Sequence, residues 1–196
     1  MGNIQKLIGM TLSFSFLFGH MQGQEPQTIL EKKASLQEPE KQERIFFTPP
    51  SGWMQAESKD LAPHILAMVL GKGSFEFPPS MNLSMEPFTG SLKNYLDIVK
   101  DINQKQGSEW KDLGTIQTAA GAASLSQADA VTEWGEIRML HVILAHNGKI
   151  YILTAAALKQ EFPSLYETFF KSLKSLQIEE EDITLAMGYT VENYGG

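Results

Sequence analysis

The sequence contains no cysteine, and this absence excludes several kinds of chemistry at once. Without thiols the chain forms no disulfide bond, no thiolate metal site, no cysteine nucleophile and no lipid-modified cysteine. Basic residues are also scarce, because sixteen Lys and Arg stand against twenty-three Asp and Glu, which leaves a net charge of −7. A nucleic-acid-binding domain presents a basic face, so this balance argues against a nucleic-acid partner.

Motifs with a known catalytic mechanism are missing as well. The sequence has no Gly-x-Ser-x-Gly elbow, no His-Glu-x-x-His pair and no phosphate-binding loop. Gly71-Lys72-Gly73 lacks a third glycine and a following helix, so it is interpreted as a loop between strands. Asp97 and Asp101 stand four apart on the polar side of an expected helix, which is typical of a solvated surface. We therefore expect no enzyme activity and no cofactor.

What the chain does contain is enough apolar material for one buried core. It has 196 residues, of which 42% are hydrophobic, and this composition predicts one folded domain with additional segments. The apolar run Leu7–Phe18 is too short to span a bilayer, and residues 1–23 are predicted to be a signal peptide cleaved after Gly23. The alternative is an N-terminal helix buried in the domain.

Charged segments flank the predicted domain. Residues 24–44 hold nine charged residues and two prolines but no aromatic residue, which predicts a flexible linker or, alternatively, a short solvated helix. Residues 179–196 begin with the acidic run Glu179–Asp182 and are predicted to be a frayed tail. The folded domain is accordingly expected over residues 45–178.

Hydrophobic periodicity divides the domain into strands and two helices. Apolar residues recur every three or four positions after Ser91 and again after Pro163, which predicts two amphipathic helices. Asn147-Gly148 between apolar runs predicts a two-residue hairpin turn. The strands are expected at residues 45–47, 64–70, 81–85, 113–118, 122–131, 136–146 and 149–155. Strands joined by short turns pair antiparallel, so the fold class is α+β.

Two histidines and two tryptophans are the candidate binding residues. His141 lies in the middle of a strand and is expected to be buried and hydrogen-bonded, whereas His146 falls on the opposite strand face beside the turn. A pocket near His64 and His141 is one candidate site, although no metal-ligand spacing accompanies them. Trp53 and Trp134 stand at turns, where a tryptophan is either a core anchor or an exposed partner contact.

The order of short motifs resembles a known fold family. The chain carries Pro50-Ser51-Gly52-Trp53 after the first strand and the hairpin sequence Asn147-Gly148-Lys149-Ile150-Tyr151. Further matching positions are Asn82-Leu83-Ser84, Ser91 to Leu96, Gly121-Ala122-Ala123, and Phe169 to Ile178. Over residues 46–178 the sequence resembles the PsbP-like fold, which includes an extrinsic photosystem protein, a yeast nuclear-import factor and many bacterial envelope proteins.

The resemblance implies an antiparallel sheet sandwiched by helices and a role in binding or assembly without catalysis. No functional residue is carried over, because no functional motif is shared. The chain also lacks the cysteine that many bacterial members use for a lipid anchor, which favours a soluble protein. We expect an exported, periplasmic or secreted, accessory protein that binds a protein or envelope component. Alternatives are a small-molecule or metal-binding module of the envelope, and a hydrolase.

Overall fold

The computed structural model describes residues 42–73 and 75–181. The predicted signal peptide, most of the predicted linker and the tail from Asp182 onward lie outside the described residues. No helix within the described ranges has the length and apolar character needed to cross a membrane.

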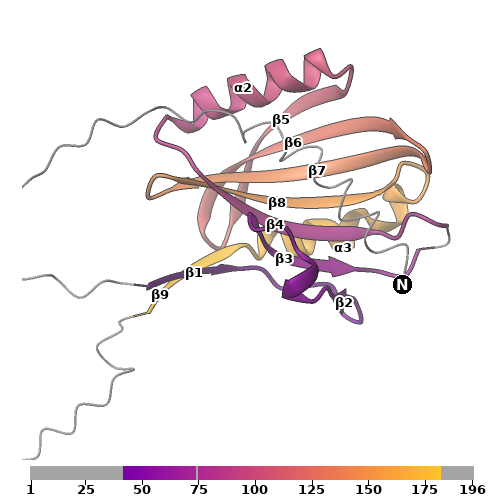
Figure 1. Ribbon diagram of the computed structural model, residues 1–196, viewed down its shortest axis with the longest axis horizontal. Helices are drawn as coiled ribbons and strands as arrows, with labels where there is room; N and C mark the ends of the chain where they lie inside the picture. Colours follow the sequence, from indigo (N-terminus) through magenta and orange to yellow (C-terminus); the bar gives the residue numbers. More distant parts are fainter. Residues whose placement is uncertain (1–41, 74, 182–196) are drawn as a thin grey trace, which may run out of the picture.

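A seven-stranded antiparallel sheet forms the centre of the domain (Figure 1). Its spatial order is β2-β3-β4-β8-β7-β6-β5, and every neighbouring pair runs antiparallel. The strands are β2 (Met54–Gln55), β3 (Ile65–Leu70), β4 (Ser80–Pro87), β5 (Glu109–Thr118), β6 (Gly121–Thr132), β7 (Gly135–His146) and β8 (Lys149–Leu158). The predicted antiparallel α+β class is therefore confirmed.

Strands β7 and β8 are joined by the predicted Asn147-Gly148 turn. Asn147 has φ 47° and Gly148 has φ 70°, and two successive positive φ values are what a type I′ turn requires. This turn sets the register that pairs His146 with Lys149 and His141 with Thr154. Strand β7 is mainly apolar on both faces, and both faces of the sheet are covered, as its sequence indicates.

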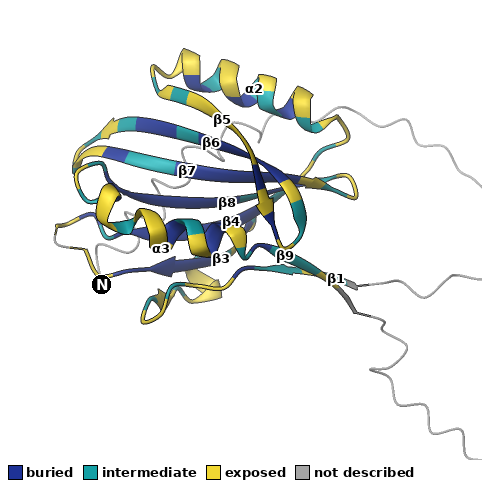
Figure 2. Cartoon of the chain, turned by 180° about the vertical axis from the view of Figure 1, so that it is seen from behind, coloured by how far each residue is buried: buried dark blue, intermediate teal, exposed yellow. Residues whose placement is uncertain are grey.

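One helix lies on each face of the sheet. Helix α2 (Leu92–Lys105) begins at Ser91, whose Oγ accepts a hydrogen bond from the Asn94 amide at 3.2 Å. Helix α3 (Phe162–Lys174) carries Pro163 in its first turn. Figure 1 shows α2 above the near face and α3 behind the strands, and Figure 2 shows α3 from its own side. A short 3-10 turn, η2 (Ser58–Asp60), precedes β3.

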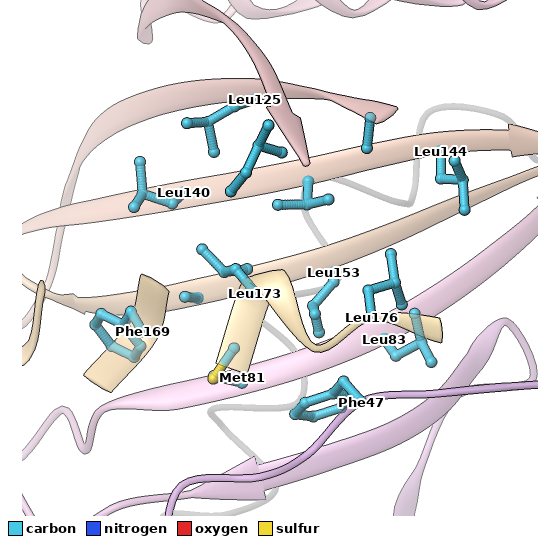
Figure 3. Packing of buried hydrophobic residues seen from close by; sticks show 14 of the residues in the cluster. Phe47, Met81, Leu83, Leu125, Leu140, Leu144, Leu153, Phe169, Leu173 and Leu176 are labelled. Atoms are coloured by element: carbon cyan, nitrogen blue, oxygen red, sulfur yellow. The ribbon is translucent and has the colours of Figure 1, made fainter. Parts of the chain in front are cut away.

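The main core lies between α3 and the sheet (Figure 3). Phe169 and Leu173 of α3 pack with Leu140 of β7 and Leu153 of β8, and all four side chains are at most 1% exposed. The opposite face holds two smaller clusters. One lies under α2 around Val99 and Ile143, and the other gathers around Met68, Phe77 and Ile137.

A separate two-stranded ribbon joins the two ends of the domain and extends beyond its predicted limits. Strand β1 (Gln42–Phe46) pairs antiparallel with β9 (Gln177–Glu181), so residues 42–44 and 179–181 are strand rather than linker and tail. Arg44 forms an ion pair with Glu179 at 3.0 Å. Glu179–Glu181 look solvated when the sequence is read alone, but the fold brings the backbone of β1 beside them as a partner.

The ribbon is also attached to the β7–β8 hairpin. Glu43 of β1 accepts a hydrogen bond from the Asn147 side chain, and its Oε1 lies 3.2 Å from His146 Nε2. His146 therefore faces the ribbon, on the side of the strand opposite to His141, as the odd spacing of the two residues predicts.

Candidate protein-binding groove

A tight turn places Trp53 at the edge of the main core. The Trp53 amide donates to the Pro50 carbonyl at 3.3 Å, and Gly52 adopts a φ of 77°, which a residue with a Cβ rarely does. The indole then meets Phe169 of α3 edge-on, with 5.9 Å between ring centroids. It also lies against the backbone of Gly71, where an added Cβ would stand 2.6 Å from Trp53 Cε2.

The last turns of α3 form the facing wall. Thr48 donates its amide to Ser175 Oγ at 2.7 Å, and that hydroxyl donates in turn to the Ser172 carbonyl at 2.7 Å. The first bond fixes the loop that precedes Trp53 to the C-terminal end of the helix, and the second, within that helix end, orients the Ser175 hydroxyl. The two walls are thus held at a set separation before any partner arrives.

Between these walls runs a groove of about 580 Å³, which we call the α3 groove. Its lining combines the apolar residues Pro49, Pro50, Trp53 and Leu165 with several hydroxyl-bearing residues. Lys171 is the single charged residue among the described residues that line it. The same lining holds no carboxylate, histidine or cysteine. The α3 groove therefore offers apolar contact and one positive charge.

Trp134 lies on the other side of the sheet from Trp53. Its ring stands 5.9 Å from that of Phe77, and it packs on the cluster around Ile137 and Leu158 as a half-buried side chain. The structure consequently does not bring the two candidate tryptophans into one surface patch. Trp53 remains the one that borders a hollow.

His141 occupies the buried position expected from its sequence. It is 1% exposed, and its Nδ1 lies 3.0 Å from Thr154 Oγ1 on the neighbouring strand, so the prediction of a buried, hydrogen-bonded histidine is confirmed. Burial lowers the pKa of His141 to about 4, because the apolar interior disfavours the imidazolium. The ring is therefore neutral at pH 7.

His64 and His141 do not share a pocket. His64 precedes β3, where its carbonyl accepts from the Met85 amide at 2.9 Å, and strands β4 and β8 separate it from β7. Three strand spacings amount to about 14 Å, which is too far for two ligands of one metal ion. Across the described residues, no group of three His, Cys, Asp or Glu side chains is arranged to hold a metal ion.

Two charged clusters stabilise the fold around these sites. Tyr95 of α2 donates its hydroxyl to Glu86 of β4, and burial raises the pKa of that carboxyl. On the α3 face, Arg138 holds Asp129 through two bonds of 2.8 and 2.7 Å. These hydrogen bonds lower the pKa of Asp129. Because the Arg138 guanidinium is already paired in this way, we assign it to structure rather than to anion binding.

The sequence did not reveal the helix residues of the groove. Thr168, Lys171, Ser172 and Ser175 follow one another at intervals of one to three and form a polar flank beside the apolar stripe of α3. The stripe alone predicted only a core-facing helix. A flank of hydroxyls and one lysine next to such a stripe is the signal that could have indicated a contact surface.

Comparison with known proteins supports the fold and nothing finer. No protein-family model matches the chain, and no curated protein matches it. Among solved structures, LpqN of Mycobacterium tuberculosis, involved in cell envelope biogenesis, superposes with a TM-score of 0.50 at 15% identity, covering 71% of this chain and 85% of LpqN. The chain has a PsbP-like fold. At this identity the likeness to LpqN shows the fold alone.

Two further solved structures are similar at lower scores. The Ran-binding protein Mog1p of Saccharomyces cerevisiae has a TM-score of 0.49 at 14% identity, covering 76% of this chain and 99% of Mog1p. The cyanobacterial PsbP of Synechocystis has a TM-score of 0.45 at 12% identity, with 76% and 99% covered.

Proposed function

We propose that this protein is an exported accessory protein that binds a protein partner through the α3 groove. The observation that carries the proposal is the position of Trp53, half-buried in the wall of a hollow whose second wall is α3. Tryptophan is enriched among the residues that dominate binding energy at protein interfaces. No catalytic constellation accompanies it among the described residues that line the hollow.

The lining favours an extended segment of the partner. An apolar side chain of that segment would lie against Trp53 and Leu165, and a neighbouring carboxylate would lie near Lys171. The hydroxyls of Thr48 and Thr168 supply hydrogen-bonding groups for the backbone of the segment. Because the Thr48–Ser175 bond already fixes the walls, little ordering entropy would be lost on binding.

The export part of the proposal rests on the sequence of residues 1–23. LpqN, which shares the fold, takes part in cell envelope biogenesis, and an envelope role for this chain is in keeping with a signal peptide. We therefore propose a periplasmic or secreted location and a partner within the envelope. Mass spectrometry of the exported protein tests this, since a mature form that still begins at Met1 would contradict it.

Photo-crosslinking from the groove tests the binding site directly. A photoreactive residue at Thr168, inside the α3 groove, is expected to give an adduct with a protein in the native compartment. The same residue at Lys174, on the same helix but outside the lining, serves as the positional control. Adducts of equal yield at both positions would show that the groove is not the contact surface.

A matched pair of charge reversals tests the role assigned to Lys171. Lys171→Glu is expected to weaken partner binding roughly threefold to tenfold, the effect of one exposed charge pair. Lys174→Glu makes the same change one turn away and should leave binding unchanged. An equal loss of partner affinity in both variants would show that only the net charge of the protein matters. It would contradict a specific carboxylate contact at Lys171.

A further inference from the structure

A row of neutral polar side chains crosses the sheet on the face covered by α2. Asn82 of β4, Thr154 of β8, His141 of β7 and Ser126 of β6 are successive partners in the strand register. Each is at most 8% exposed. The row lies between the apolar cluster under α2 and the cluster around Phe77.

This buried row overturns what the sequence pattern of β4 predicts. The alternation Met81-Asn82-Leu83-Ser84-Met85 predicts a half-buried strand whose polar residues face water. In the structure Met81 and Leu83 face the main core, but Asn82 and Ser84 are each only 5% exposed. Polar groups placed in an interior need hydrogen-bond partners in place of water.

Helix α2 adds a buried amide to this face. Asn103 is 0% exposed, and its Nδ2 donates to the Val99 carbonyl at 2.8 Å. Its Oδ1, however, accepts no hydrogen bond from any described residue. Ser126 Oγ and Trp110 Nε1 on the same face likewise lack a partner within the described ranges. A buried polar atom without a partner costs about 1–3 kcal/mol, so native proteins rarely leave several of them on one face.

A small cavity adjoins the Asn103 amide. It measures about 20 Å³ and lies between Val99 and Asn103 of α2 and His141 and Ile152 of the sheet. A cavity needs roughly 10–15 Å³ of this kind to hold a water molecule. Its described lining includes no Lys, Arg, Asp or Glu, and His141 is neutral at pH 7. A charged ligand would find no counter-charge there, and an apolar one would leave Asn103 Oδ1 unsatisfied.

We propose that this cavity is a binding site for a neutral hydroxyl group that donates a hydrogen bond to Asn103 Oδ1. The hydroxyl is that of an ordered water molecule, because a cavity of about 20 Å³ holds roughly one water and is too small for a polyol. The site is distinct from the α3 groove, because it lies on the opposite face of the sheet.

Nuclear magnetic resonance on the ¹⁵N-labelled full chain tests the site. Water-selective NOE and ROE spectra should show a cross-peak of opposite sign in the two experiments between the Asn103 side-chain amide protons and a long-lived water. Glycerol and acetate, which are both larger than a water molecule, serve as controls and should leave the cross-peak unchanged. The absence of any cross-peak, or its loss on adding either solute, overturns the proposal.

A pair of leucine substitutions gives an independent test, because the proposal predicts the sign of the change in Tm. Asn103→Leu would expel the bound hydroxyl, and we expect Tm to fall by about 3 °C or more. Asn94→Leu makes the same change on the exposed side of α2 and should shift Tm by only about 1–2 °C. If the cavity were empty, Leu at 103 would fill it and remove an unsatisfied atom. A rise in Tm for Asn103→Leu would therefore overturn the proposal.

Discussion

Acidification should destabilise this protein through His141 before most carboxylates titrate. The imidazole is 1% exposed and its pKa lies at about 4, against an ordinary value of 6.5. Between these two values the unfolded chain binds a proton at His141 and the folded chain does not. Stability therefore rises with pH across this window and is lost as pH falls through it.

The size of the effect follows from the width of the window. Each pKa unit corresponds to about 1.4 kcal/mol, so lowering the pH from 7 to 4 should remove about 3 kcal/mol of unfolding free energy through this one residue. Below pH 4 both states carry the proton and the loss stops growing. A domain with ordinary stability of about 5–15 kcal/mol would lose a substantial part of it.

Urea denaturation of the wild type and of His141→Gln, measured at half-unit steps from pH 7.5 to 3.5, isolates this contribution. Glutamine does not titrate and can still hydrogen-bond to Thr154. The difference between the two unfolding free energies should shrink by about 3 kcal/mol as pH falls from 7 to 4. Parallel curves throughout this range would refute the assignment of a buried neutral imidazole.

Two further substitutions test the groove wall and the ion pair on the α3 face. Gly71→Ala should displace the Trp53 indole and lower the free energy of unfolding by about 1–3 kcal/mol, because a Cβ there would stand 2.6 Å from the ring. A red shift of tryptophan fluorescence reports the displacement. An unchanged spectrum together with an unchanged Tm would contradict it. Asp129→Asn should cost about 2 kcal/mol at pH 7, because Arg138 loses a charge-assisted pair. Since the pKa of Asp129 is lowered, this cost should begin to shrink as pH falls below the ordinary aspartate value and should disappear only below the lowered pKa. Urea denaturation should therefore show a smaller cost at pH 3 than at pH 7.

Local patterns predicted the elements whose partners lie close in the sequence. Asn147-Gly148 specifies the β7–β8 turn by its own backbone preference, and Ser91 marks the start of α2 by its own hydroxyl. The apolar character of both faces of β7 likewise predicted that both faces are covered. In each case the residues that decide the structure are neighbours along the chain.

The features that sequence reasoning missed depend on contacts between distant segments. Glu179 belongs to a strand because Arg44, far away in the sequence, supplies both a backbone partner and a charge. Trp53 borders a groove because α3 places Phe169 against it. His141 was correctly expected to be buried, but its place in a row with Asn82 depends on a register that no local pattern contains.

The β1–β9 ribbon gives the described domain a single point of attachment. Gln42, where the described chain enters, is paired with Glu181, where it leaves. Anything connected at both positions therefore meets the domain at one corner, and Figure 1 shows this corner at the tip of the ribbon. Domains with adjacent ends tolerate insertion into other proteins. This domain could thus be placed within a loop of another protein without separating any two strands of its central sheet.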